Sequence, residues 1–379
     1  MNPRADTLKV WIEINRSAIR HNINEFRRLI GDKTQLWSVV KSNAYGHGLF
    51  SFIRIANELG VDGFCVDSVV EGVKLREQGI TKPILVLGPT LPSLFMVSAT
   101  HNLTLSISSY DTLTAYVNEI KSPERRPAIH LKIDTGMHRQ GFYVADLPAV
   151  AKLLVKHKVK LTGVFSHFAS AKDLNYPTYS ERQFSSFETA VDILKRAGFT
   201  DIKRHISATG GTLVDSKYHL DAVRIGIGLY GVFPSKELEL QLRDSVNLKP
   251  VLSWHSVISE IKEVEKGEYV SYDLTERLTR DTKMAIVPIG YWHGYPWSLS
   301  SAGQVLINGK RANVLGRVTM DMLMIDITGI KAKIGDRVTM IGTQEKETIT
   351  AEELARRAKT TTAYEIITRL NPLTERIIT

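Results

Sequence analysis

Charged and polar side chains recur where short apolar runs end in the first 230 residues. They are Lys41 after TQLWSVV, Lys132 and Asp134 in AIHLKID with Arg139 beyond, His167 in LTGVFSHF, Ser207 after DIKRHI and Arg224 in AVRIGI. Any one of them has an ordinary explanation as a solvated lysine, a hydrogen-bonded core histidine or a helix cap. Their recurrence at the ends of successive runs instead predicts one shared site. A lysine in a partly desolvated site has a lowered pKa and can form a Schiff base with a carbonyl substrate or with pyridoxal phosphate.

The elements that must position these residues follow a repeated pattern of apolar run, polar or glycine turn, and amphipathic segment. One such segment opens near Ser17, stops at Gly31 and carries its apolar residues on one face, namely Ile19, Ile23, Phe26 and Ile30. Apolar strands that alternate with helices are typical of a parallel sheet covered on both faces. Eight such strands predict a (β/α)8 barrel of the TIM type, with a doubly wound open sheet as the alternative. The predicted strands are 34–41, 63–68, 83–88, 103–108, 128–134, 161–168, 201–207 and 222–227.

The pattern changes after about residue 245, where apolar runs follow one another with few helical segments between them. Asn308-Gly309 lies between two such runs and is a strong signal for a hairpin turn. SWHSVISEIKEV reads as one strand, and a single helix is expected after Thr350, which has Glu353 in capping-box spacing. We therefore expect an α/β barrel over 1–245 and a mostly β domain over 246–379. A first strand at 8–15 could join the β domain.

Composition excludes several other classes of protein. The 379 residues carry a formal charge of +9, but the basic residues are spread along the chain without runs or interleaved aromatics, so no nucleic-acid partner is expected. No apolar segment has the length of a signal peptide or a membrane span, which predicts a cytoplasmic protein without a membrane partner. The single cysteine, Cys65, lies in an apolar run and reads as a core residue, and no metal site is expected.

Two glycine-rich stretches, 207–212 and 224–228, permit close approach of the backbone to a phosphate group. The second begins a literal GxGxxG, from Gly226 to Gly231. This motif lies after the last predicted barrel strand and not in the first βα turn, so a dinucleotide site is rejected.

Taken together, VVKSNAYGHG, LKIDTGMHRQGF, GVFSHFAS, RIGIGLYG, VPIGYWHGYP, LGRVTMDMLMIDIT and AYE resemble the motifs of the alanine racemases, in the same order along nearly the whole chain. Those enzymes depend on pyridoxal 5'-phosphate and have an α/β barrel followed by a β domain. The resemblance implies that Lys41 binds the cofactor as a Schiff base and acts as one base, while Tyr291 acts as the other from the opposite face. Racemisation needs both, since a proton taken from one face must be returned to the other. His167 and Arg224 would support Tyr291, and Arg224 would face the pyridine nitrogen.

The resemblance also implies binding roles. The phosphate would be held by Tyr45, Ser207, Tyr364 and the backbone of Gly226 and Ile227.

Arg139 would contact the cofactor hydroxyl and the substrate, oriented by Lys132, which is carbamylated in many relatives. The backbone at Met320 would receive the carboxylate of the amino-acid substrate. In the family, the residues that correspond to Tyr291 and Met320 come from a second subunit, which implies a homodimer with shared sites. The resemblance also implies that the product is D-alanine for the cell wall.

The chain departs from the family pattern at Lys172, Ile206, Ile225, His293, Trp297 and Ala363. None of these changes removes a predicted catalytic group, but those at 172, 293 and 363 bear on substrate preference. Alanine is the expected substrate, because Tyr364 favours a small side chain. The alternatives are a racemase of serine, lysine or several amino acids, and a non-catalytic carrier of pyridoxal phosphate.

Overall fold

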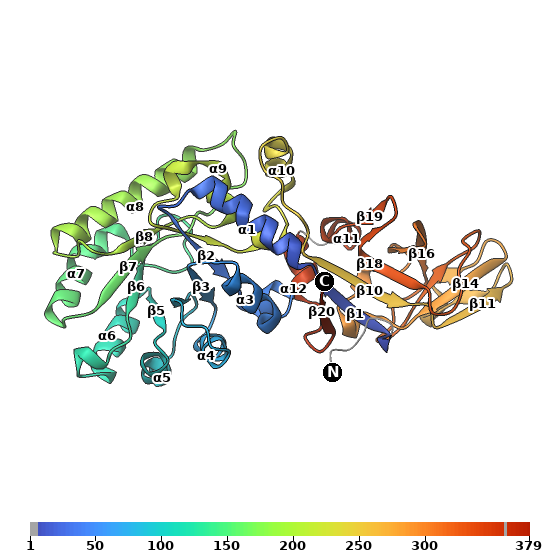
Figure 1. Ribbon diagram of the computed structural model, residues 1–379, viewed down its shortest axis with the longest axis horizontal. Helices are drawn as coiled ribbons and strands as arrows, with labels where there is room; N and C mark the ends of the chain where they lie inside the picture. Colours follow the sequence, from blue (N-terminus) through green and yellow to red (C-terminus); the bar gives the residue numbers. More distant parts are fainter. Residues whose placement is uncertain (1–6, 360–361) are drawn as a thin grey trace. The chain divides into compact units, whose positions relative to one another are not determined.

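The computed structural model describes residues 7–359 and 362–379, which form two compact units (Figure 1). The barrel unit comprises Ala18–Ser42 and Phe52–Lys249. The β unit takes its described residues from Met1–Ser17, Asn43–Ser51 and Pro250–Thr379. The segment Asn43–Ser51, which closely follows Lys41, therefore belongs to the β unit, whereas the chain before and after it belongs to the barrel unit.

The barrel unit contains eight parallel strands in the order β8-β7-β6-β5-β4-β3-β2-β9. The ends of this order approach each other, because the amide of Arg224 on β9 donates to the carbonyl of Ser207 at 3.0 Å and Ala208 forms an isolated bridge with Arg224. The eight predicted strands and the nearly closed barrel are thus confirmed, and the open doubly wound sheet was wrong. The strands are β2 (Gln35–Val39), β3 (Gly63–Val66), β4 (Ile84–Val86), β5 (Thr104–Ile107), β6 (Ile129–Lys132), β7 (Leu161–Phe165), β8 (Lys203–His205) and β9 (Ala222–Ile225).

Helices lie outside these strands (Figure 1) and bury their apolar faces against them. Helix α1 (Arg16–Ile30) buries the predicted face of Ile19, Ile23, Phe26 and Ile30, and it ends at Gly31, whose φ of 66° is the left-handed value favoured by glycine. The other helices are α2 (Lys41–Tyr45), α3 (Leu49–Glu58), α4 (Val69–Glu77), α5 (Phe95–Thr100), α6 (Tyr110–Glu119), α7 (Leu147–Lys156), α8 (Thr178–Arg196), α9 (Thr209–Val214) and α10 (Lys236–Leu242).

The β unit is built on a ten-stranded sheet in which β1 (Val10–Ile14) pairs with β10 (Leu252–Val257) and β20 (Glu375–Ile378). Asn308 and Gly309 make the predicted two-residue turn, with φ values of 46° and 73°. The other strands of this sheet are β11 (Glu260–Val264), β14 (Thr282–Val287), β15 (Gln304–Ile307), β16 (Lys310–Leu315), β17 (Leu323–Asp326), β18 (Arg337–Gln344) and β19 (Glu347–Ile349). The short strands β12 (Tyr269–Val270) and β13 (Glu276–Arg277) pair with each other in a separate two-stranded sheet.

Two expectations for this unit were wrong. The run 253–264 forms two strands, because β10 pairs with β1 and β18 whereas β11 pairs with β14. After Thr350, the residues that the structure describes form two helices, α11 (Ala351–Arg357) and α12 (Ala363–Thr368), and not one. Thr350 caps α11 as predicted by accepting from the amide of Glu353, whose carboxylate bonds Arg311 and Arg357.

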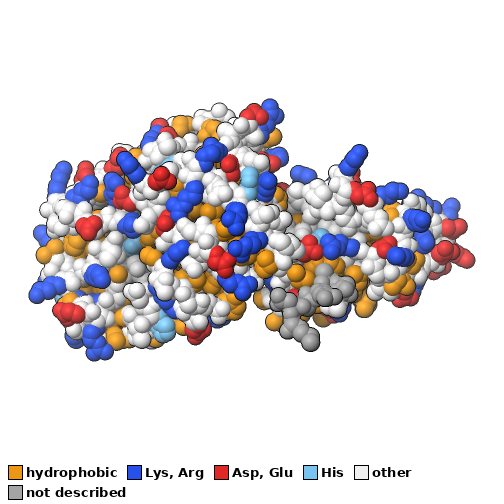
Figure 2. Space-filling model, viewed as in Figure 1, with side chains coloured by type: hydrophobic (Ala, Val, Ile, Leu, Met, Phe, Trp, Pro, Cys, Tyr) orange, Lys and Arg blue, Asp and Glu red, His pale blue; other side chains and the backbone are white. Residues whose placement is uncertain are grey.

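Basic side chains are scattered over the visible face of the molecule among acidic and uncharged ones (Figure 2). In the part of the chain that the structure describes, no helix is long and apolar enough to cross a membrane.

Candidate active site

Lys41 follows the end of β2 and begins α2, a turn with unusual backbone geometry. Ser42, Asn43, Ala44 and Tyr45 have φ values of 55°, 56°, 52° and 52°, so four successive non-glycine residues are left-handed. Such a conformation costs about 1–2 kcal/mol per residue, and backbone strain of this kind concentrates at functional sites. The amide of Ser42 donates to the carboxylate of Glu71 at 2.8 Å, which fixes the start of the turn. The Lys41 side chain is 38% exposed and its amine lies 4.0 Å from the carboxylate of Asp67, so it is open to a reactant.

Lys132 ends β6 inside the barrel and is almost completely buried. Burial, and then the charges of Arg139 and Arg224, lower the pKa of its amine to about 8. Its Nζ donates to Oε1 of Gln140 at 3.0 Å, a partner that the sequence patterns did not single out. One carboxylate oxygen of Asp134 accepts from the amides of Gly136, Met137 and His138 at 2.9–3.0 Å, which fixes the loop leading to Arg139.

Arg224 is buried inside the barrel and is fixed by acceptors on β8 and on the residues that directly follow β7 and β8. Its Nη2 donates to the carbonyls of Ser166 at 2.8 Å and Ile206 at 3.0 Å, and lies 3.3 Å from Nδ1 of His167. Its Nη1 donates to Nδ1 of His205. Burial lowers the pKa of Arg224 to about 10, so the guanidinium stays charged at neutral pH. Burial and the charge of Arg224 lower the pKa of His167 to about 3, so this imidazole is neutral.

The structure adds two histidines to this centre. His205 lies between Arg224 and His130, with its Nε2 2.8 Å from Nδ1 of His130. The signal for both was present in the alternation of the strands, since His130 precedes Lys132 by two residues and His205 precedes Ser207 by two, and such residues share a face. Neither histidine was among the residues predicted for the site.

Ser207 is fully buried, and its hydroxyl donates to the carbonyl of Tyr218 at 2.8 Å. Its carbonyl pairs with the amide of Arg224, which ties it to the next strand. Gly226 and Ile227 follow β9 at the start of the short helix Ile227–Tyr230. Ser207 and the pair Gly226 and Ile227 therefore follow neighbouring strands, β8 and β9, at the carboxyl-terminal edge of the barrel.

The β unit brings the remaining predicted residues together in two pairs. In the first, the rings of Tyr45 and Tyr364 lie 6.0 Å apart, and Tyr364 is on α12, the helix that the sequence patterns missed. In the second, Tyr291 and Met320 come together because the amide of Trp292 donates to the carbonyl of Met320 at 3.0 Å.

The close approach of the backbone before Tyr291 to the backbone of Thr319 and Met320 depends on Gly290. A Cβ atom at this position would lie 2.1 Å from the carbonyl oxygen of Thr319. Tyr291 and Met320 are 45% and 52% exposed in the single chain. His293 is one of the departures from the family pattern. Its Nδ1 accepts a hydrogen bond from the amide of Gly290 at 3.2 Å, so it supports this turn.

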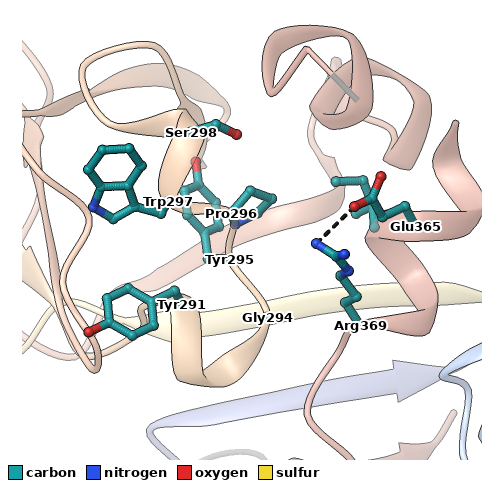
Figure 3. A pocket seen from close by; sticks show the side chains of 9 residues that line it. Tyr291, Gly294, Tyr295, Pro296, Trp297, Ser298, Glu365 and Arg369 are labelled. Carbon is teal, nitrogen blue, oxygen red and sulfur yellow. Dashed lines mark ion pairs between the residues drawn. The ribbon is translucent and has the colours of Figure 1, made fainter. Parts of the chain in front are cut away.

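A pocket of about 490 Å³ lies beside Tyr291 in the β unit (Figure 3). Tyr291 and Trp297 lie on one side of it, and the ion pair of Arg369 with Glu365, 2.8 Å long, lies on the other. The guanidinium of Arg317 covers the Trp297 ring at 4.6 Å, so this second departure from the family pattern stacks against a cation.

The electrostatics of the barrel site suit an anion. The charges of Lys41, Arg139 and Arg224 all lower the pKa values of Lys132 and His167, in addition to burial. A group that carries a phosphate and a carbonyl fits this set of donors, since the cations attract the phosphate and the Lys41 amine can add to the carbonyl. Among residues 7–359 and 362–379, no cluster of histidine, cysteine, aspartate and glutamate is arranged to bind a metal ion.

Comparison with known proteins matches both parts of the chain to the same family. The family model for the alanine racemase N-terminal domain matches residues 14–234, and that for the C-terminal domain matches residues 251–378. Alanine racemase from Leptospira interrogans is 36% identical over 380 residues, with 98% of this chain and 96% of that protein covered. Alanine racemase from Halothermothrix orenii is 36% identical over 375 residues, with 97% and 96% covered.

Solved structures agree with this result. A crystal structure of alanine racemase from Bacillus anthracis with bound L-Ala-P has a TM-score of 0.92 and 34% identity, with 98% of this chain and 95% of that chain covered. Alanine racemase from Clostridium difficile 630 gives a TM-score of 0.91 and 32% identity, with 98% and 96% covered. With both family models matched along almost its whole length, the chain belongs to the alanine racemase family.

Proposed function

We propose that this chain interconverts L-alanine and D-alanine with pyridoxal 5'-phosphate as its cofactor. The observation that carries the proposal is the open amine of Lys41 in the same electrostatic neighbourhood as Arg224, whose guanidinium is buried and charged. Membership of the alanine racemase family supports the choice of reaction.

The cofactor, when bound, supplies a carbonyl that captures the substrate amine and a ring that withdraws electrons from the substrate α-carbon. Ser207 and the amides of Gly226 and Ile227 would hold its phosphate, together with the hydroxyls of Tyr45 and Tyr364.

Arg224 would face the ring nitrogen. A guanidinium keeps its proton, so it can donate a hydrogen bond to that nitrogen without protonating it. By leaving that nitrogen unprotonated, Arg224 would limit the negative charge that the ring can take up and would thereby disfavour side reactions such as transamination. Arg224 keeps its charge at neutral pH although burial lowers its pKa to about 10, which supports this role.

Lys41 and Tyr291 would act as the two bases, one on each face of the substrate α-carbon. His167 would extend the hydrogen-bond network of Arg224 toward Tyr291, and its neutral imidazole suits an acceptor role. A tyrosine hydroxyl ordinarily titrates near pH 10, so it needs such a network to accept a proton at neutral pH.

Arg139 would hold the substrate region, with its loop fixed by Asp134 and its orientation set by Lys132. Met320 would offer its backbone to the substrate carboxylate. We place Tyr291 and Met320 in the site of a partner subunit, and their exposure in the single chain supports a homodimer. Sedimentation of the purified protein tests this part of the proposal, since a monomer that racemises alanine at full rate would contradict it.

The alternatives are racemisation of serine or lysine, and carriage of the cofactor without catalysis. The exposed Lys172 is the departure that bears most on preference, since a cation near the entrance would disfavour lysine. A carrier would not need Tyr291.

Two variants test the proposal. We expect Lys41→Ala to lose the absorbance band of the lysine-bound cofactor. We expect Tyr291→Phe to keep that band and to stop conversion starting from L-alanine, whereas Tyr143→Phe, an exposed control in the barrel unit, should behave as wild type. Undiminished conversion by Tyr291→Phe would refute the two-base assignment, and a normal band in Lys41→Ala would refute the role of Lys41.

A further inference from the structure

Three side chains form a continuous hydrogen-bonded chain across the interior of the barrel. Arg224 on β9 donates to Nδ1 of His205 on β8, whose Nε2 lies 2.8 Å from Nδ1 of His130 on β6. All three are buried, with exposures of 2%, 0% and 3%. Each imidazole also packs between rings, since Trp37 lies against both histidines and Phe165 stacks on His205 at 5.0 Å and 6°.

The hydrogen bonds fix every proton in this chain. A guanidinium only donates, so Nδ1 of His205 accepts and carries no hydrogen. The hydrogen of neutral His205 must then be on Nε2, from which it is donated to Nδ1 of His130. Nδ1 of His130 therefore also accepts, and its hydrogen is on Nε2. Protonation of either ring would place a second N–H donor against a neighbour that already donates.

Burial supports the neutral state of both rings. It lowers the pKa of His130 to about 3 and that of His205 well below its ordinary range, and the charge of Arg224 acts in the same direction. The guanidinium therefore carries the charge of this chain alone.

The backbone makes room for His130 at one position. A Cβ atom on Gly163, in the middle of β7, would lie 2.6 Å from Cε1 and Nε2 and 2.7 Å from Cδ2 of the His130 ring. A glycine inside a strand usually marks such a close approach, because glycine otherwise weakens a strand. Gly163 thus admits the imidazole against the strand and fixes where it lies.

We propose that His130 is a positioning residue for Arg224: it accepts the Nε2 hydrogen of His205, and this acceptance keeps Nδ1 of His205 available to hold the guanidinium in place. Its value to the enzyme rests on the proposed role of Arg224 toward the cofactor ring. Without the acceptor at His130, the buried Nε2–H of His205 loses its partner, so the Nε2–H tautomer loses its advantage over the Nδ1–H tautomer. In the Nδ1–H tautomer, His205 no longer offers an acceptor to Arg224.

Two substitutions at His130 separate the hydrogen bond from the packing. Asparagine offers an amide oxygen close to the position of Nδ1, so His130→Asn keeps an acceptor for His205. Leucine fills a similar space without an acceptor, so His130→Leu removes it. His101→Asn changes a histidine that bonds the carbonyl of Val97 on a barrel helix, and serves as the control.

The first readout is the tautomer of His205, from nitrogen NMR of protein labelled at histidine, with His205→Gln used to identify the signals by difference. We expect Nε2–H in wild type and in His130→Asn, and a mixture or the Nδ1–H form in His130→Leu. The second readout is the affinity of cofactor-free protein for pyridoxal phosphate. It should fall about tenfold in His130→Leu, the equivalent of one unsatisfied buried donor. His130→Asn should restore most of it.

An Nδ1–H or doubly protonated His205 in wild type would overturn the inference, as would an unchanged His205 tautomer in His130→Leu. Equal losses of cofactor affinity in the leucine and asparagine variants would also overturn it, since packing alone would then explain them. The tautomer is measured without substrate or cofactor. A protein that shows the expected tautomers but does not racemise alanine would therefore refute the proposed function and leave the hydrogen-bond chain standing.

Discussion

The substitution Gly163→Ala tests how tightly the barrel holds His130. The added Cβ would lie 2.6–2.7 Å from three atoms of the imidazole, whereas carbon atoms in contact are normally about 3.5–4.0 Å apart. The ring would have to retreat by about 1 Å. It is held on its other sides by Trp37 and by the 2.8 Å contact with His205, so it cannot retreat without breaking one of them.

Overpacking of this kind costs about 1–3 kcal/mol, and we expect a loss of about 2–3 kcal/mol in the free energy of unfolding. Asparagine has no atoms at the positions of Cε1 and Nε2, so only one of the three close contacts, that at the position of Cδ2, remains. In the His130→Asn background the same Gly163→Ala change should therefore cost less than about 1 kcal/mol, which gives a coupling energy of about 1–2 kcal/mol.

The assay is urea unfolding of the four proteins of this cycle, followed by circular dichroism and tryptophan fluorescence. Gly72→Ala is the control, because its Cβ would meet only the flexible end of the Leu103 side chain. A Gly163→Ala cost that is equal in both backgrounds would show that the imidazole is not what the glycine accommodates, and would refute the reasoning.

Three further predictions concern stability and reactivity. The His255 side chain holds the pKa of Glu13 at about 2, so Glu13 stabilises the fold fully above pH 4.5 and loses this effect as the pH falls from 4.5 to 2. Glu13→Gln should cost about 1–2 kcal/mol at pH 7 in urea unfolding, and a gap that does not narrow toward pH 2 would contradict this. Arg126 is buried and donates to the carbonyls of Ile120, Val117, Lys121 and His157, so Arg126→Met should lower the free energy of unfolding by at least about 3 kcal/mol. The exposed Arg125→Met should change it by less than about 0.5 kcal/mol, and equal effects of the two would refute the role of these bonds. Burial raises the pKa of Cys65 to about 12, so native protein should not react with a thiol reagent at pH 8 until it is unfolded.

Sequence patterns were sufficient for most of the barrel strands because those strands are buried on both faces and are therefore mostly apolar. They were also sufficient for the turn at Asn308 and Gly309, where local backbone preference decides the structure. They failed at 253–264, since whether one run makes one strand or two depends on which distant strands it pairs with.

The candidate site divides in the same way. Lys41 and Arg224 could be predicted from their places along the strands. Strand alternation puts His130 and His205 on the same face as Lys132 and Ser207, but it does not specify their contacts. Those contacts, and that of Gln140, join residues on different strands or across a loop whose course no local pattern specifies. The left-handed turn after Lys41 also lies outside such patterns, because Ser-Asn-Ala-Tyr has no intrinsic preference for four left-handed residues.

The most direct test of the proposed function is an assay of the purified protein with added pyridoxal phosphate. The absorbance of the lysine-bound cofactor is recorded, and the conversion of L-alanine, L-serine and L-lysine to their D forms is then measured. We predict a cofactor band and turnover of alanine well above that of serine and lysine. Turnover of serine or lysine equal to or above that of alanine would contradict the substrate, and a cofactor band without racemisation of any of the three would contradict the proposed catalysis.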